Sequence, residues 1–413
     1  MRFAIDAYAP RALATPETHA ELATILRDAE AAGDAVVAFG GGTLQSLGFA
    51  PARYEIAIST ERLRGIAAYE PRDLTVSVEA GTTLGELADD LARYGQEVPF
   101  DLPMPRRTTV GGALASGWLG PRRLAAGRLR DHLIGSTVAL ANGTVARAGG
   151  MVVKNVSGYD VGKLYTGSLG TLGLFARANF RTRPLPESRR CFIATLPEAT
   201  ASRAVGHVAG LDVEPTVALV VRGFAAEIDG REGLDGRLFL MYDGSRPTVD
   251  RATRGLRSAL GSAGVPETTI VDAGANEAYA RVLDAYVTPL GERSATYRTL
   301  SLPSDVGLRV RRARDLARAH GLELETIADL TTGDCIARCS GETARSFAAK
   351  IAAFDDAYHL AAPATIVLVA PAAMRRRLAM WGALPSGIGA MRALKRRFDP
   401  RATLAPGRYV GGI

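Results

Sequence analysis

The stretch Thr108–Gly173 decides the fold of this chain. Its two ends read TTVGGALASG (Thr108–Gly117) and YTGSLGTLG (Tyr165–Gly173). Small residues dominate both ends, so the backbone can come close to a large, flat, anionic ligand. A third small-residue loop, FGGGTL at Phe39–Leu44, follows a strand-like run upstream. Three such loops that serve one ligand are typical of a site for flavin adenine dinucleotide (FAD).

Length and composition describe an ordinary globular protein. Its 413 residues are 47% hydrophobic and 23% charged, which leaves room for two domains with separate cores. No run of about 18 apolar residues is present, so we expect no membrane-spanning helix. The first residues, MRFAIDAYAPRALATPET, lack the apolar segment of a signal peptide. The chain is therefore expected in the cytoplasm.

The chain is basic, with a formal net charge of +7. Only four of its 50 basic residues are lysines, and the arginines are spread through the sequence. This distribution indicates a composition bias, and we expect no nucleic-acid partner. We interpret two basic clusters, Arg375–Arg377 and Lys395–Arg397, as solvated helix faces. Lys154 and Lys163 fall inside the glycine-rich segment, which hints that lysine is required there.

Cysteines and histidines do not form a recognisable site. Three cysteines, Cys191, Cys335 and Cys339, cannot make a disulfide framework. The five histidines do not stand at ligand spacing beside a cysteine or a carboxylate pair. We therefore expect buried structural thiols and no metal site.

The first 185 or so residues alternate between short strands and helices. The TPE sequence at residues 15–17 is typical of a helix start, and Gly33 of its end. Thr83–Glu86 has the pattern of a capping box at the start of a second helix. Asn142–Gly143 lies between two strand-like runs and predicts a tight hairpin. Together these signals predict an α+β fold rather than a regular doubly wound sheet.

Two other nucleotide-binding motifs are not supported. Gly40–Leu44 does not supply the GxGxxG spacing of the dinucleotide fold. Gly158–Leu164 resembles a P-loop but is one residue too short, and it has leucine where a hydroxyl should hold magnesium.

The region after Pro186 predicts a second α+β domain. Strand-like runs cover residues 216–222, 237–242, 295–300, 322–327, 335–339 and 364–369. Helical patterns cover residues 247–260, 304–320 and 342–358.

The ordered set of motifs resembles the FAD-binding family named for p-cresol methylhydroxylase (PCMH) and vanillyl-alcohol oxidase. The matching pieces are Phe39–Leu44, Val76–Leu84, Thr109–Gly117, Arg130–Gly135, Gly150–Lys154, Val156–Gly173 and the tail Phe398–Arg408. Within this family, KNVSGYDVGKLYTGSLGTLG and the ending DPRATLAPGRYVGGI resemble the small FAD-binding subunits of bacterial glycolate oxidases. The resemblance implies a two-part PCMH-type FAD-binding domain plus an α+β cap domain. Their expected bounds are 1–186 and 187–389, and residues 390–413 would return to the flavin.

The resemblance also implies roles for individual residues. In the first loop, backbone N–H groups would bind the FAD diphosphate. Thr109 would cap a short helix whose open first turn faces the same diphosphate. Residues of the third loop would bond to the ribose or adenine, and Lys163 would neutralise phosphate charge. The expected cofactor-binding residues are Gly40, Gly41, Gly42, Thr43, Thr109, Gly111, Gly112, Ala115, Ser116, Gly117, Asp131, Lys163, Gly167, Ser168, Gly170, Thr171 and Gly173.

The flavin is expected to be non-covalent, since relatives with a covalent bond carry a histidine in the first loop and this chain has none there. Oxidation of a 2-hydroxy acid needs a proton acceptor, a cation for the carboxylate and a hydride acceptor. The histidine-rich metal motif of the wider family is missing here; Thr332–Asp334 is only a fragment of it. Arg408 is the first catalytic candidate because the tail should pass near the flavin. The others are Arg222, Tyr242, Tyr297 and Arg298.

Three functions remain open. The first is a glycolate oxidase flavoprotein subunit that takes part in oxidation of glycolate or D-lactate. It would relay electrons between a second flavin subunit and an iron–sulfur subunit, in the cytoplasm or peripheral to the inner membrane through the complex. The second is a stand-alone FAD-dependent alcohol or hydroxy-acid oxidase or dehydrogenase. The third is a structural subunit whose FAD organises the fold.

Overall fold

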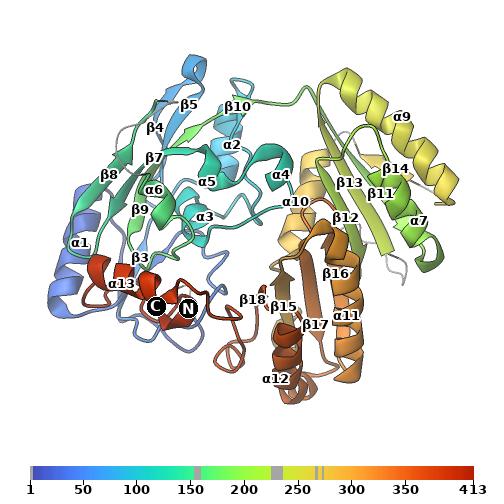
Figure 1. Ribbon diagram of the computed structural model, residues 1–413. Coiled ribbons are helices and arrows are strands. Elements are labelled where there is room, and N and C mark those ends of the chain that lie inside the picture. Colours follow the sequence, from blue (N-terminus) through green and yellow to red (C-terminus); the bar gives the residue numbers. More distant parts are fainter. Residues whose placement is uncertain (1–2, 153–159, 225–235, 266–267, 272–273) are drawn as a thin grey trace. The chain divides into compact units, whose positions relative to one another are not determined.

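A computed structural model describes residues 3–152, 160–224, 236–265, 268–271 and 274–413, which fold into two compact units (Figure 1). Unit 1 comprises Met1–Gly120, Gly127–Leu185 and Ala372–Ile413. Unit 2 comprises Pro121–Ala126 and Pro186–Pro371. Lys154 and the motif residues from 153 to 159 lie outside the described residues. Helices and sheets occur in both units, so the predicted α+β class is confirmed.

Unit 1 contains three sheets among its described residues. A parallel sheet has the order β1-β3-β2, an antiparallel sheet has the order β4-β5-β9-β7-β8, and β6 pairs with β10. The strands are β1 (Ala12–Ala14), β2 (Val36–Phe39), β3 (Ile56–Ser59), β4 (Ile66–Glu70), β5 (Thr75–Glu79), β6 (Gln96–Glu97), β7 (Leu133–Ala139), β8 (Val145–Gly149), β9 (Leu174–Arg181) and β10 (Arg183–Pro184).

The helices of unit 1 follow local signals closely. They are α1 (His19–Ala32), α2 (Leu84–Ala92), α3 (Val110–Ser116), α5 (Leu129–His132), α6 (Gly162–Tyr165) and α13 (Ile388–Phe398). Gly33 ends α1 in the left-handed conformation, and Thr83 with Glu86 forms the predicted capping box of α2. The start of α1 differs from the prediction. Its cap is Thr18, whose hydroxyl accepts from the Glu21 N–H, rather than Thr15.

The core of unit 1 joins two of its sheets through α1. Leu22 and Leu26 of α1 pack with Val36 and Ile58 of the parallel sheet and with Leu174 of the antiparallel sheet. The predicted hairpin is present, since β7 pairs with β8 across Asn142–Gly143. This core holds the end of β2 and the start of β9 near each other.

Unit 2 is built on one antiparallel sheet. Its order is β14-β11-β13-β12-β16-β17-β15-β18. The strands are β11 (Ser188–Leu196), β12 (Val217–Arg222), β13 (Gly236–Gly244), β14 (Thr268–Val271), β15 (Ser294–Thr299), β16 (Glu323–Asp329), β17 (Cys335–Ser340) and β18 (Thr365–Val369). The helices are α4 (Arg123–Ala126), α7 (Glu198–Ala209), α9 (Arg246–Ala263), α10 (Ala275–Ala285), α11 (Val306–Ala319) and α12 (Ala344–Ala361).

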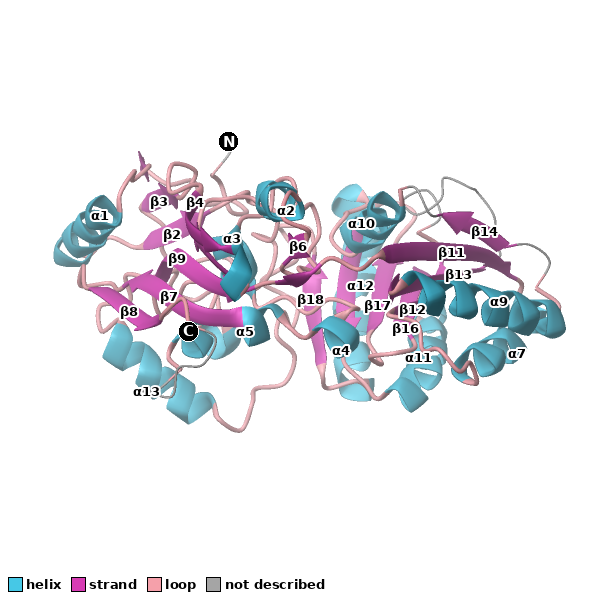
Figure 2. Ribbon diagram, turned by 90° about the horizontal axis from the view of Figure 1, so that it is seen from above, coloured by secondary structure: helices cyan, strands magenta, loops and turns pink. Residues whose placement is uncertain are grey.

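Helices cover both faces of this sheet. Alternate β11 residues such as Phe192 and Leu196 pack against α7 and α9. The Cys191 thiol on the opposite face donates to the carbonyl of Ala275 in α10, and Phe239 stacks on Tyr279 of α10. Figure 2 shows α10 on one side of β11 and α7 with α9 on the other.

The unit boundaries differ in part from the predicted domain bounds. The compact units divide at Leu185 and Pro186, near the predicted bound of 186, but Pro121–Ala126 groups with unit 2, and the chain returns to unit 1 at Ala372, whereas the predicted tail begins at Ala390. The reason is a set of contacts made by residues before α13: Arg375 pairs with Asp6, and the Trp381 indole donates to the carbonyl of Arg408. Assignment of FAD binding to unit 1 and of a cap role to unit 2 stays a prediction.

The two basic clusters are not simple solvated helix faces. Residues 375–377 lie in turns, and Arg375 is buried beside Asp6. Lys395 lies on α13 as expected, but its side chain is buried, whereas Arg396 and Arg397 are exposed. The prediction was wrong for Arg375 and Lys395, because both side chains are buried against acceptors from distant parts of the chain, which a local run of basic residues does not reveal.

Candidate functional site

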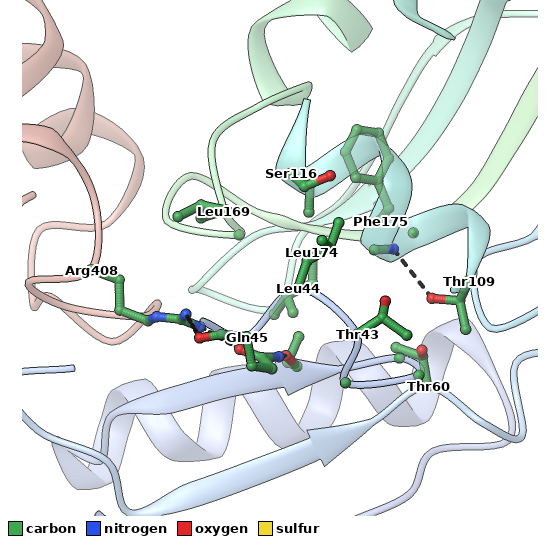
Figure 3. Close-up of a pocket in the computed structure, with 18 of the residues that line it drawn as sticks. Thr43, Leu44, Gln45, Thr60, Thr109, Ser116, Leu169, Leu174, Phe175 and Arg408 are labelled. Atoms are coloured by element: carbon green, nitrogen blue, oxygen red, sulfur yellow. Dashed lines mark hydrogen bonds between the residues drawn. The ribbon is translucent and has the colours of Figure 1, made fainter. Parts of the chain in front are cut away.

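One pocket of unit 1 gathers the three small-residue loops (Figure 3). The first loop follows β2, the second forms α3, and the third leads into β9. Twelve of the predicted site residues line it: Gly40, Gly41, Gly42, Thr43, Thr109, Gly111, Gly112, Ala115, Ser116, Gly170, Gly173 and Arg408. The other lining residues are Ala38, Leu44, Gln45, Thr60, Leu169, Leu174 and Phe175.

Glycines around the pocket have two different structural roles. A Cβ on Gly41 would lie 1.8 Å from the carbonyl oxygen of Arg107, so the two loops require glycine there in order to touch. In contrast, a Cβ on Gly42 or Gly170 would meet nothing within 4 Å, and one on Gly112 would meet only the Thr109 hydroxyl at 3.2 Å. These three glycines leave space that side chains would otherwise fill, which gives a ligand access to bare backbone.

The first loop offers unused hydrogen-bond donors. Within the part of the chain that the structure describes, the backbone N–H groups of Gly41, Gly42 and Thr43 donate no hydrogen bond. Successive free N–H groups in a turn form a concavity that binds phosphate oxygens. This arrangement fits the diphosphate of FAD.

The hydroxyl of Thr43 is already committed to its neighbour. Thr108 Oγ1 donates to the carbonyl of Pro103 at 2.6 Å, so its single proton is used. The contact of 2.8 Å between the Thr43 and Thr108 hydroxyls therefore has Thr43 as donor. Thr43 is left with its backbone N–H as a donor and its hydroxyl oxygen as an acceptor.

The second loop differs from its prediction in one respect. Thr109 caps α3 as expected, because its hydroxyl accepts from the N–H of Gly112 at 3.2 Å (Figure 3). However, Val110 N–H donates to the carbonyl of Thr82, and Gly111 N–H donates to that of Ala80. The first turn of α3 is therefore not open to a diphosphate through these groups. Its contribution is a wall of small residues.

Four residues of the predicted set lie away from the pocket lining. Ser168 donates its hydroxyl to the carbonyl of Tyr165, and Thr171 donates to that of Ser168. Both side chains are buried and close their own turn. A Cβ on Gly117 would lie 2.7 Å from the Cα of Gly167, so this glycine pair allows two loops to pack directly.

The two charged residues of the predicted set also lie away from it. Asp131 accepts hydrogen bonds from Arg128 at the start of α5. Burial raises the pKa of Asp131, but the hydrogen bonds from Arg128 outweigh it and the net pKa is lowered. Lys163 pairs with Asp160 at 2.7 Å, one turn away on its own segment. Cofactor contacts by either residue stay predictions.

Arg408 lines the pocket, but its N–H groups donate hydrogen bonds to other residues of the protein. Its guanidinium donates to the side-chain and backbone oxygens of Gln45, at 2.5 and 2.8 Å, and to the carbonyl of Leu47 at 3.0 Å (Figure 3). Burial, together with the charge of Arg375, lowers its pKa to about 10. Arg408 stays protonated near neutral pH and is not suited to accept a proton.

The remaining catalytic candidates lie in unit 2 and serve its packing. Arg222 pairs with Glu198, and Arg298 is buried against Asp334. Tyr242 and Tyr297 are buried, and burial raises the pKa of both phenols. No group of three or more potential metal ligands exists among the described residues, and none of their helices is long and apolar enough to cross a membrane.

Sequence reasoning missed the lining residues that carry no glycine signal. Gln45 directly follows the first loop motif, and Leu169 lies inside the third. Their positions relative to these motifs could have identified both as lining residues. Thr60 directly follows β3 and Phe175 lies at the start of β9, and only the folded chain brings them together.

Comparison with known proteins identifies the same architecture. Residues 10–149 match the family described as FAD binding domain. The chain is 26% identical to glycolate oxidase subunit GlcD of Bacillus subtilis (strain 168), and the match covers 97% of this chain and 88% of that subunit. It is 30% identical to glycolate oxidase subunit GlcE of Escherichia coli (strain K12). That match covers 46% of this chain and about half, 51%, of the relative.

The fold also matches a solved structure. The crystal structure of p-cresol methylhydroxylase with substrate bound superposes with a TM-score of 0.73 at 16% identity, and the match covers 98% of this chain and 89% of that one. The predicted family and its cofactor are thereby confirmed. The bare backbone at Gly42, Gly112 and Gly170 and the unused N–H groups of the first loop fit FAD as the occupant. The chain carries an FAD-binding domain, its fold is that of the PCMH-type flavoproteins, and FAD is its cofactor.

Proposed function

We propose that this chain is the FAD-binding subunit of a glycolate oxidase-type complex, which takes part in oxidation of a 2-hydroxy acid such as glycolate or D-lactate. The prediction of an FAD-dependent oxidoreductase is supported by the relatives, which include subunits of glycolate oxidase. The single observation that carries the proposal is the pocket in unit 1, where three glycine loops leave bare backbone beside unused N–H donors.

The residues of unit 1 would hold and orient FAD. The N–H groups of Gly41, Gly42 and Thr43 would bind the diphosphate, and α3 with Gly170 would flank the less polar part of the cofactor. FAD supplies the hydride acceptor when it is bound. The non-covalent attachment is supported by the pocket lining, which carries neither histidine nor cysteine among the described residues.

The polarity of the pocket bears on the choice between a self-sufficient enzyme and a subunit. Oxidation of a hydroxy acid needs a group that takes the hydroxyl proton. The described lining contains no histidine, lysine, tyrosine or carboxylate, and its one charged side chain is Arg408. The proton acceptor would therefore come from outside this lining. The subunit function allows a partner subunit to contribute this group.

The division of labour within the complex is part of the proposal. The chain would exchange electrons with a second flavin subunit and an iron–sulfur subunit, in the cytoplasm or at the inner membrane surface. Its similarity to both a GlcD and a GlcE subunit supports assembly into a subunit complex. The runner-up is a stand-alone FAD-dependent alcohol or hydroxy-acid oxidase or dehydrogenase, favoured by other relatives that are named D-lactate dehydrogenase and D-2-hydroxyglutarate dehydrogenase.

Anaerobic absorbance spectroscopy of the FAD-loaded chain separates these functions. Bleaching of the flavin bands by glycolate or D-lactate would favour the stand-alone enzyme. The subunit function predicts that the isolated chain stays oxidised with either acid but bleaches with dithionite. It also predicts that addition of the cognate second flavin subunit restores bleaching by the acid. If the flavin stays oxidised in the presence of the acid even in the assembled complex, the subunit function is contradicted.

A further inference from the structure

We propose that two buried cations of the C-terminal segment, Lys395 and Arg408, form a clamp that fixes the spacing between the first and third loops of the flavin pocket. In this account both are positioning residues rather than catalytic ones. The inference rests on FAD as the occupant of the pocket, and it assigns to the C-terminal segment a role in holding that site ready for the cofactor.

Lys395 binds the third loop. Its ammonium donates to the carbonyl of Thr171 at 2.9 Å, the carbonyl of Leu404 at 2.7 Å and the carboxylate of Asp399 at 2.6 Å. Its side chain and that of Asp399 are buried. Thr171 directly follows Gly170 of the pocket lining, so the bond to its carbonyl holds the loop where the pocket needs it.

Arg408, at the other end of the same segment, binds the residues that follow the first loop. The residues that it holds, Gln45, Leu47 and Phe49, directly follow the glycine motif. The guanidinium is buried, with 3% of its residue surface exposed. Each of these carbonyls would lack this partner without Arg408, and buried carbonyls are costly to leave unpaired.

The segment between the two cations is attached to β2. Val36 N–H donates to the carbonyl of Thr403 at 2.7 Å, and Ala405 N–H donates to the carbonyl of Val36 at 2.8 Å. Leu404 lies beside Val36 as an isolated parallel bridge. The C-terminal segment therefore contacts the strand that leads into the first loop, the residues that follow this loop, and the third loop. In Figure 1 it lies in unit 1 with α13.

The choice of lysine at position 395 supports the clamp. Arginine fills 46 of the 50 basic positions of this chain, yet lysine stands here. An ammonium has three donors arranged around one nitrogen, and three acceptors surround Lys395. A guanidinium is planar and longer, so it would not direct donors at all three. Burial lowers the pKa of Lys395, while the nearby Asp399 partly offsets that effect.

The test is the FAD affinity of clamp variants, measured by fluorescence titration of the apoprotein well below its melting temperature. Lys395→Met and Lys395→Arg are each expected to raise the dissociation constant at least tenfold. Arg408→Lys keeps the positive charge but loses the branched guanidinium that reaches Gln45 and Leu47. It is also expected to raise the dissociation constant for FAD. Arg396→Met, an exposed neighbour on α13, and Lys350→Met, in unit 2, are matched controls and should leave it unchanged.

A second measurement separates positioning from simple stabilisation. In the wild type, FAD should protect the third loop and the tail from hydrogen exchange together. In Lys395→Met, protection of the tail by FAD should be lost while the remaining core of unit 1 keeps its exchange pattern. If Lys395→Met lowers the melting temperature but binds FAD with wild-type affinity, the clamp is contradicted. If Lys395→Met does not fold, Lys395→Arg and Arg408→Lys carry the same test. A wild type that fails to bind FAD would overturn the cofactor assignment itself, which is a different failure.

Discussion

The hydroxyl of Thr43 donates a hydrogen bond to the hydroxyl of Thr108, 2.8 Å away, and the hydroxyl of Thr108 donates one to the carbonyl of Pro103. This relay joins two loops that lie 65 positions apart in the sequence. It fixes the first glycine loop against the segment that precedes α3. The pocket therefore depends on a polar link as well as on small residues.

Thr108→Val should destabilise the protein by about 1–3 kcal/mol, because the carbonyl of Pro103 and the hydroxyl of Thr43 both lose a buried partner. Urea denaturation of the two proteins measures the difference. Thr108→Ser keeps the hydroxyl and serves as control, so it should retain most of the stability. Equal losses in the valine and serine variants would show that the relay does not matter.

Two glycine substitutions should behave in opposite ways. Gly41→Ala places a Cβ 1.8 Å from a backbone oxygen of Arg107, and should destabilise the apoprotein by at least about 2 kcal/mol. Gly112→Ala fits a helical backbone and should leave apoprotein stability within about 1 kcal/mol of wild type. Its methyl group would enter the pocket and weaken FAD binding. Thermal unfolding and FAD titration of both variants check this, and strong FAD binding by Gly112→Ala would contradict the location of the site.

The three thiols should be inert in the folded protein. Cys191, Cys335 and Cys339 are buried, and burial raises the pKa of Cys191 and of Cys335 to about 12. The reactive thiolate is therefore scarce near neutral pH. A thiol-specific reagent should label none of them in native protein and all three after denaturation. Rapid labelling of one thiol in the native state would contradict the burial described here.

His359 should give unit 2 a pH-dependent stability. Burial lowers the pKa of this ring, but hydrogen bonds and the charge of Asp355 outweigh it, and the net pKa is raised. The ring Nδ1 lies 3.0 Å from the backbone oxygen of Asp355 and 3.4 Å from its carboxylate. Because the folded pKa is raised, the stabilisation is complete below the unfolded value of about 6.5 and is lost as pH rises through the folded value.

Melting temperatures of the wild type and His359→Gln across this range test the prediction. The melting temperature of the wild type should exceed that of the variant most at about pH 5.5. The difference should shrink as the pH rises past the folded pKa of His359. A gap that grows with pH would mean that the ring is held neutral in the folded state.

Local signals in the sequence predicted much of the fold. The capping box of Thr83 with Glu86, the left-handed Gly33 and the Asn142–Gly143 hairpin each depend on residues a few positions apart. The order of motifs also predicted that the glycine loops form one site. These features are set by backbone chemistry that neighbouring residues determine.

The features that could not be predicted depend on distant partners. Lys395 and Arg375 read as surface charges, and only the folded chain shows the carbonyls and the carboxylate around them. Ser168 and Thr171 had the right chemistry for a ligand, but their own turn uses their protons. The prediction that the first turn of α3 is open was wrong for the same reason. The carbonyls of Thr82 and Ala80 already accept from its N–H groups.

The attachment of FAD is a separate test of the pocket. Because the described lining offers neither histidine nor cysteine, acid or heat denaturation followed by filtration should release all flavin into the filtrate. Flavin that stays with the precipitated chain would show a covalent bond and contradict the predicted non-covalent attachment.

Titration of the purified apoprotein with FAD tests the central claim most directly. The account predicts saturable binding of one FAD per chain, with quenching of flavin fluorescence, and a clear loss of affinity in Gly112→Ala at unchanged fold. Absence of binding by a chain with native circular dichroism, or undiminished binding by Gly112→Ala, would contradict the assignment of this pocket.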